Sequence, residues 1–190
     1  MFSSSISRRA LLASLGVGAG VGLVPRLGYA TLVRGMTLSE LVGRSQHVLV
    51  GTPLAAECRY LTIGGRRMLI TETRLRVEGV LALQAPPETE LVVRTLGGHL
   101  GREGELVHGQ AQLTPGARCA AFFERAPDGA CWVTGMAQGH YPLENADGSL
   151  VLRASPQLPT ILQWEHSAVK RLAGIRLEAA ERAIAEVNAR

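Results

Sequence analysis

The chain has 190 residues, of which 20 are lysine or arginine and 16 are aspartate or glutamate, for a formal net charge of +4. Three of the positive charges, Arg8, Arg9 and Arg26, lie in the first thirty residues, where no acidic residue occurs. The rest of the chain carries 17 basic and 16 acidic residues, and a surface so close to neutral argues against a nucleic-acid or anionic-membrane partner. Its length fits one domain with a single core, with an appended helix as an option.

Residues 1–30 are typical of a twin-arginine signal peptide. Arg8 and Arg9 are followed one residue later by two leucines, as in the pattern S-R-R-x-[FL]-L, and residues 10–24 form an uncharged, mildly apolar segment. This segment is too short and too weakly apolar for a membrane span, and the small residues that end at Ala30 predict cleavage there. An uncleaved anchor and an ordinary Sec signal are the alternatives. We expect a periplasmic or secreted protein whose mature form is not embedded in a membrane.

One short helix and then a series of strands are predicted after the signal. Thr37 and Glu40 have the spacing of a capping box, which predicts a helix through about residue 44. From 67 to 81, apolar or threonine side chains alternate with charged ones, which predicts a long, half-buried strand. Further strands, separated by glycine- and proline-containing turns, are predicted at 47–57, 90–96, 118–124, 131–135, 140–143 and 149–153.

These strands follow one another with short connections and no helical pattern between them, which is typical of an antiparallel barrel or sandwich. From 159 to 188 the period changes to three and four residues, which predicts one amphipathic helix. Packing on the barrel or over a sheet edge is the simplest role for its apolar stripe, and a partner interface is the alternative. The expected fold is therefore mainly β: a small antiparallel OB-like β-barrel over 31–156 with a short N-terminal helix, and a long C-terminal amphipathic helix within 157–190.

Four strand-and-turn motifs keep a characteristic order along the chain, and they lie at 48–52, 76–81, 91–98 and 115–123. This order resembles a family of exported bacterial proteins of unknown function. It is also similar to the OB-fold barrel of netrin-like modules, the class that includes tissue inhibitors of metalloproteinases. The resemblance covers about residues 37–143 and implies a fold rather than an activity. Those inhibitors begin with a zinc-chelating cysteine, whereas this mature chain is expected to begin at Thr31, so no inhibitory residue is carried over.

The longest predicted loop, 97–109, contains five glycines and the residues that come closest to a metal site. His99 and His108, with Glu103 and Glu105, offer the imidazoles and carboxylates that a divalent metal accepts. Their spacing matches no recognised ligand motif, and ordinary solvated loop residues are the alternative. No nucleophile motif such as G-x-S-x-G occurs in the chain.

A second candidate site follows a predicted buried strand. Gln138, His140 and Tyr141 lie beside a glycine and are predicted to line a small binding face. A strand bend with the tyrosine packed at the rim of the barrel is the alternative.

The three cysteines, Cys58, Cys119 and Cys131, form no C-x-x-C pair. In an oxidising periplasm, Cys119 and Cys131 are the expected disulfide partners. Three reduced and buried cysteines are an equal alternative.

The sequence as a whole favours binding over catalysis. We expect an exported, non-catalytic binding or accessory module that meets a protein partner or another component of the cell envelope at 97–109 or across the barrel face. No cofactor is expected. The alternative is a metal-binding protein or enzyme that uses His99 and His108.

Overall fold

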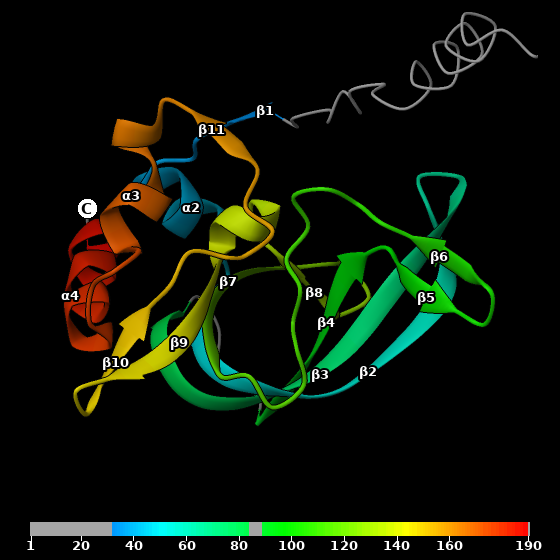
Figure 1. The fold of residues 1–190 in the computed structure, drawn as a ribbon, viewed down its shortest axis with the longest axis horizontal. Coiled ribbons are helices and arrows are strands. Elements are labelled where there is room, and N and C mark those ends of the chain that lie inside the picture. The colour runs from blue at the N-terminus through cyan, green and yellow to red at the C-terminus, as the bar shows by residue number, and fades with distance from the viewer. Residues whose placement is uncertain (1–31, 84–88, 190) are drawn as a thin grey trace, which may run out of the picture.

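The computed structural model describes residues 32–83 and 89–189 (Figure 1). The predicted signal residues Arg8, Arg9 and Ala30 lie outside these residues. The described chain is mainly β, and its largest element is a seven-stranded mixed sheet. None of its helices is both long and apolar enough to cross a lipid bilayer.

The helices are short, and they are α2 (Leu38–Arg44), α3 (Ala168–Leu172) and α4 (Leu177–Asn188), with 3-10 turns η1 (Met136–Gly139) and η2 (Trp164–His166). The strands are β1 (Leu32–Arg34), β2 (His47–Ile63), β3 (Arg66–Leu83), β4 (Glu90–Leu96), β5 (Gly98–Leu100), β6 (Glu103–Glu105), β7 (Cys119–Arg125), β8 (Cys131–Val133), β9 (His140–Ala146), β10 (Ser149–Leu152) and β11 (Thr160–Leu162).

The capping box that the sequence predicts is present at the start of α2. The Thr37 hydroxyl accepts a hydrogen bond from the Glu40 backbone nitrogen at 3.2 Å, and the Glu40 carboxylate accepts one from the Thr37 backbone nitrogen at 2.7 Å. These bonds satisfy amides that have no partner within the helix. The apolar face of α2, which includes the fully buried Leu41, can then pack against the sheet.

The seven-stranded sheet has the order β10-β9-β7-β2-β3-β4-β8, and β7 also pairs with β8. The strands β2, β3, β4, β8 and β7 are thus linked by a ring of pairings. An odd number of strands cannot alternate in direction all the way round, so one neighbouring pair must be parallel. That pair is β4–β8. The prediction of a wholly antiparallel arrangement is correct for the other pairs of this sheet and wrong for this one.

The predicted single helix from 159 to 188 is wrong. The backbone of β11 pairs in parallel with β1, so the residues after Pro159 are used as a strand. Gly174, with φ of +87°, then separates α3 from α4, and its amide donates to the Leu152 carbonyl. The amphipathic pattern does hold within α4, where Ala180 and Ile184 are fully buried.

Two buried clusters result from this arrangement. In the first, α2, α3 and α4 pack on one end of the sheet through residues such as Leu41, Leu172 and Ile184. The second lies among β2, β3, β4, β7 and β8 and includes Leu75 and Val93. The three helices lie together at one end of the molecule, and the β5–β6 hairpin lies at the other (Figure 1). Residues 97–109, which the sequence predicts to be a loop, contain this small hairpin, because β5 and β6 pair with each other.

Candidate functional site

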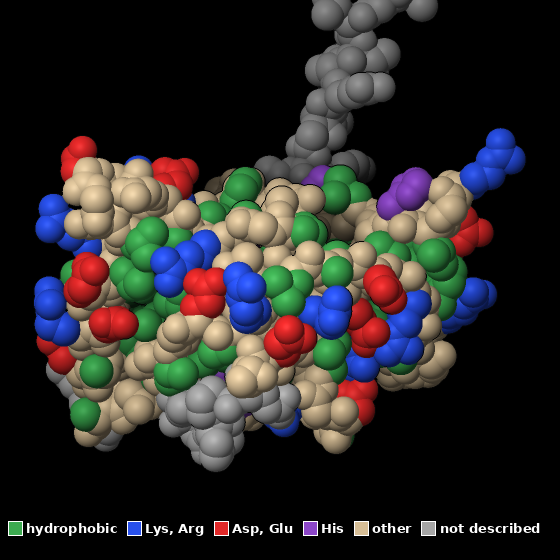
Figure 2. Space-filling model, turned by 90° about the horizontal axis from the view of Figure 1, so that it is seen from below, with side chains coloured by type: hydrophobic (Ala, Val, Ile, Leu, Met, Phe, Trp, Pro, Cys, Tyr) green, Lys and Arg blue, Asp and Glu red, His purple; other side chains and the backbone are tan. Residues whose placement is uncertain are grey.

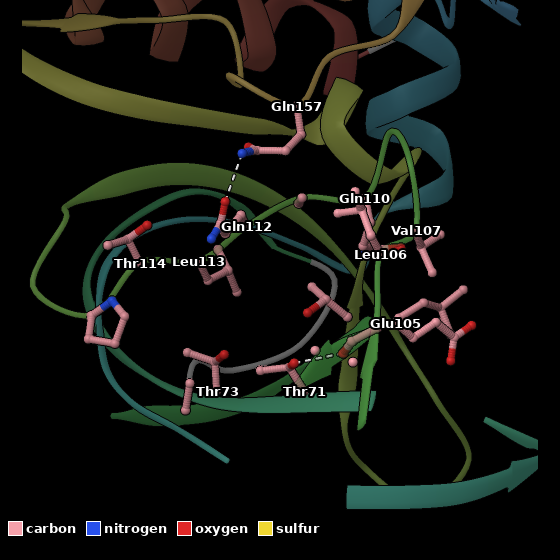
Figure 3. A pocket seen from close by; sticks show the side chains of 18 residues that line it. Thr71, Thr73, Glu105, Leu106, Val107, Gln110, Gln112, Leu113, Thr114 and Gln157 are labelled. Atoms are coloured by element: carbon pink, nitrogen blue, oxygen red, sulfur yellow. Dashed lines mark hydrogen bonds between the residues drawn. The ribbon is translucent and has the colours of Figure 1, made fainter. Parts of the chain in front are cut away.

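A pocket of about 590 Å³ lies between strands β3 and β4 on one side and residues 104–115 on the other. In Figure 3, Thr71 and Thr73 line one side of this space, and Leu113 and Thr114 lie across from them. We call it the threonine pocket. Pockets of this size are typical of sites for small ligands.

The strand register places three threonines on the pocket wall. Side chains two residues apart share one face of a strand, so Thr71 and Thr73 lie on the same face of β3 as the buried Leu75. Thr71 is paired with Thr95 of β4, which brings the Thr95 side chain to the same face. Thr73 and Thr95 are buried, at 1% and 6% exposure. Neither hydroxyl makes a hydrogen bond to another described residue, and both residues line the pocket.

The turn after β4 fits closely against this wall. The Thr71 hydroxyl donates to the Gly97 carbonyl oxygen at 2.8 Å. The next residue, Gly98, has φ of +137°, and a Cβ there would lie 2.4 Å from the Thr71 hydroxyl oxygen. Only glycine fits such a close approach. The glycine therefore keeps the chain beside β3 while residues 104–115 cross above the threonines.

Glutamines complete the polar part of the lining. Gln110 is buried at 8% exposure, and Gln157 donates to the side-chain oxygen of Gln112 at 2.7 Å across the pocket rim (Figure 3). The side-chain oxygen of Gln157 is itself buried and has no hydrogen-bond partner among the described residues. A buried acceptor without a partner costs about 1–3 kcal/mol, which a donor from a ligand would recover.

The threonine pocket carries almost no charge. Among its lining residues only Glu105 is ionisable, and this side chain is exposed at the rim. The neutral polar residues of the lining are Thr71, Thr73, Thr95, Thr114, Gln110, Gln112 and Gln157. Hydroxyl and carboxamide groups both donate and accept hydrogen bonds, so the lining suits a ligand that is polar but uncharged.

A much smaller cavity, of about 70 Å³, adjoins the pocket and shares Gln112, Thr114 and Gln157 with it. His140 lines this cavity, with its Nδ1 3.1 Å from the Ser155 hydroxyl. Burial lowers the pKa of His140 to about 4, and burial raises the pKa of the neighbouring Cys119 thiol to about 12. Both groups are therefore neutral near pH 7, in keeping with the uncharged lining of the threonine pocket.

Gln138, His140 and Tyr141 do not form the shared binding face that the sequence predicts. Gln138 is engaged with the backbone of residues 34–36, at 2.8 Å from the Met36 nitrogen and 3.1 Å from the Arg34 oxygen. Tyr141 is fully buried, and its ring meets Phe122 edge to face at a centroid distance of 6.1 Å. Of the three, His140 alone lies beside the threonine pocket, through the small cavity.

The two histidines of the glycine-rich segment are not gathered into a metal site. His99 is exposed on β5, and His108 is exposed and lines a different cleft. Within residues 32–83 and 89–189, no group of three histidine, cysteine, aspartate or glutamate side chains has the geometry to hold a metal ion. Glu103, a predicted carboxylate ligand, instead accepts a hydrogen bond from the hydroxyl of Tyr60 on β2.

The predicted disulfide between Cys119 and Cys131 does not form, because the strand register keeps the two residues apart. Cys131 on β8 is opposite Arg125, six residues along β7 from Cys119. Six residues of strand span about 20 Å, whereas a disulfide needs Cα atoms within about 7 Å. All three cysteines are thiols, and Cys119 and Cys131 are buried. The alternative of three reduced cysteines describes the structure better, although Cys58 is only half-buried.

One feature of the sequence does indicate the threonine pocket, although threonine is not a residue type that by itself suggests a binding site. Thr71 and Thr73 occur on the apolar face of the alternating strand, where polar side chains are uncommon. The glutamines carry no comparable sign, because their approach to this face depends on how residues 104–115 cross the sheet.

No protein-family model matches the chain, and neither a curated protein nor a solved structure matches it. The function must therefore be inferred from the geometry of the pocket.

Proposed function

We propose that the protein is a non-catalytic binding module whose ligand is an uncharged, hydrogen-bonding molecule held in the threonine pocket. The observation that carries this proposal is a pocket of about 590 Å³ whose polar lining consists of threonine and glutamine side chains, with one carboxylate at the rim. Neutral donors and acceptors recognise hydroxyl and amide groups, and the exposed Leu106 at the pocket mouth adds an apolar contact.

We further infer that the five strands β2, β3, β4, β8 and β7 form an OB-like barrel. The ring of pairings and the single parallel pair β4–β8 support this inference. OB folds are small five-stranded barrels that bind ligands through the barrel face and its loops. In this chain the threonine pocket would lie at the interior face of the barrel, beneath the connection between β4 and β7.

We propose that the protein is exported through its twin-arginine signal and that the ligand is a component of the cell envelope, either a glycan or a peptide segment of a protein. Basic and acidic side chains are interspersed over the face shown in Figure 2. A face of mixed charge does not attract a strongly charged partner such as a nucleic acid, which agrees with an uncharged glycan or peptide as the ligand. A variant with Arg8→Lys and Arg9→Lys should remain in the cytoplasm at full length, whereas the natural chain should be recovered from the periplasm beginning at Thr31. Equal export of both would contradict this part of the proposal.

The binding proposal is tested by nuclear magnetic resonance on isotopically labelled mature chain. Neutral sugars and capped peptides are titrated in parallel with uronic acids and uncapped peptides of the same size. We expect neutral compounds to shift the methyl resonances of Thr73, Thr95 and Leu113 and to bind more tightly than their charged counterparts.

Two variants separate the pocket from the rest of the surface. Thr73→Val combined with Gln110→Leu keeps the size of the lining but removes two hydrogen-bonding groups, and it should weaken neutral-ligand binding at least tenfold. Thr62→Val, at an exposed position of the β2–β3 hairpin, is the matched control and should bind as the natural chain does. Binding that survives in the double variant would reject the threonine pocket as the site.

A further inference from the structure

A second cleft, of about 640 Å³, lies on the other side of Leu96 and Gln110, the two residues that it shares with the threonine pocket. We call it the Trp132 cleft. Residues from β1, α2, β7, β8 and η1 line it, and so does His108. Its lining is unlike that of the threonine pocket, because it combines large apolar side chains with charged ones.

The apolar part of the cleft is built around an indole ring. Trp132 lies on β8 between two buried neighbours, Cys131 and Val133, and is itself half-buried. Met136 and Val33 line the same cleft. An indole with a nearby thioether favours a flat, aromatic ligand, because aromatic rings pack well against both groups.

The charged part of the cleft is formed mainly by guanidinium groups. Arg34 and Arg44 line it, against the single carboxylate of Glu124. Arg34 forms an ion pair at 2.7 Å with Glu40, a residue that does not line the cleft. Arg44 approaches Glu124 only to 3.7 Å, beyond hydrogen-bonding distance, so its donors are not fully used by that contact. A guanidinium in this state can bind a carboxylate or sulfonate through two parallel hydrogen bonds.

The backbone at the edge of the cleft supplies a separate observation. Met136 has φ of +58°, and it follows Gly135, which has φ of +67°. A left-handed conformation is ordinary for glycine but strained for methionine, and such strain is concentrated at binding sites. Here the strained residue is one whose side chain lines the cleft.

We propose that the Trp132 cleft binds an aromatic monoanion, with the anionic group at Arg44 and the ring system against Trp132 and Met136. This site is distinct from the threonine pocket and takes the opposite kind of ligand. Charge complementarity and the indole together define the class: a flat apolar body with one negative charge.

The test uses two dyes with the same aromatic body. 8-Anilinonaphthalene-1-sulfonate carries one negative charge, and N-phenyl-1-naphthylamine is neutral. We expect the sulfonate to bind the mature chain with one-to-one stoichiometry and at least tenfold more tightly than the neutral dye. Arg44→Gln should remove this preference without affecting the neutral dye, whereas Arg171→Gln, at an exposed position of α3, should preserve it.

The aromatic contact is tested by Trp132→Leu, which should weaken both dyes at least tenfold, with Trp164→Leu as the control at an exposed tryptophan. Met136→Gly relieves the backbone strain, so it should leave the folded state intact while it weakens dye binding, and circular dichroism establishes that each variant is folded. Thr73→Val should leave dye binding unchanged. Sulfonate binding that is equal in the natural chain, Arg44→Gln and Trp132→Leu, or that is lost in Thr73→Val, would overturn the proposal.

Discussion

The side chain of Gln138 joins η1 to the backbone of Met36: its Oε1 accepts a hydrogen bond from the Met36 nitrogen at 2.8 Å. Its Nε2 donates to the Arg34 carbonyl oxygen at 3.1 Å. Both Gln138 and Met36 are buried, each at 6% exposure. One carboxamide thus fixes the connection between β1 and α2 against the end of the sheet.

We predict that Gln138→Leu destabilises the protein. The substitution leaves the buried Met36 amide without its acceptor, which costs about 2 kcal/mol of unfolding free energy. Gln112→Ala, which removes an exposed hydrogen bond, should cost less than about 1 kcal/mol. Urea unfolding at pH 7 measures both. Equal losses in the two variants would mean that Gln138 has no special structural role.

Tyr141→Phe should stabilise the protein. The Tyr141 hydroxyl is buried and has no hydrogen-bond partner among the described residues, and burial raises its pKa. Removing this hydroxyl should raise the unfolding free energy by about 1 kcal/mol, because phenylalanine keeps the contact with Phe122. Tyr60→Phe, which removes an exposed hydroxyl bonded to Glu103, is the matched control and should be neutral or slightly destabilising. Thermal unfolding measures both variants. A Tyr141→Phe variant that is less stable than Tyr60→Phe would show that the Tyr141 hydroxyl does have a stabilising partner.

His140 should make the stability depend on pH between about 6.5 and 4. Burial lowers its pKa in the folded state to about 4, below the usual value near 6.5, so the unfolded chain takes up a proton first as pH falls. The contribution of neutral His140 to the free energy of unfolding is therefore full above pH 6.5 and declines as the pH falls toward 4. A shift of this size corresponds to up to about 3 kcal/mol.

The matched variant for this test is His140→Asn, which keeps a polar atom near Ser155 but does not titrate. Urea midpoints at pH 7, 5.5 and 4 should fall more in the natural chain than in the variant. Parallel pH profiles would show that His140 is not the titrating group.

Arg94 should control a second pH range, at more acidic values. Its guanidinium contacts Glu72 at 2.8 Å and Asp128 at 2.5 Å. Hydrogen bonds from Arg59 and Arg94 lower the pKa of Glu72, and the bond from Arg94 lowers that of Asp128. Carboxylates with lowered pKa values stabilise the fold above their usual values near 4, and this contribution is lost as pH falls further.

Arg94→Met should therefore lower the urea midpoint at pH 7 and reduce the further loss between pH 4 and pH 2. Arg153→Met, which breaks the exposed pair with Glu144, is the control and should change neither quantity appreciably. An unchanged acid profile in Arg94→Met would contradict the role of this cluster.

The parts of the fold that the sequence predicted well depend on local rules. The Thr37–Glu40 capping box and the alternation around Thr73 follow from contacts within a few residues, and the structure contains both. The parallel pair β4–β8 was not predicted, because it is a consequence of how an odd ring of strands must close.

The C-terminal region and the site show where local patterns are insufficient. The spacing of apolar residues continued through 159–188, yet pairing with β1 and the turn at Gly174 divide that stretch. Chemical type alone points to His99 and His108 as metal ligands, but the structure does not bring them together in a metal site. The pocket instead combines Thr73, a polar side chain on the apolar face of β3, with Gln110, which the path of the chain between β4 and β7 brings to it.

The most direct test of the central claim is crystallographic: crystals of the mature chain soaked with a mixture of neutral sugars and capped peptides. We predict electron density for a neutral compound in the threonine pocket, within hydrogen-bonding distance of the Thr73 or Thr95 hydroxyl or the Gln110 carboxamide. Compounds bound only elsewhere, with this pocket left without density at saturating concentrations, would contradict the account.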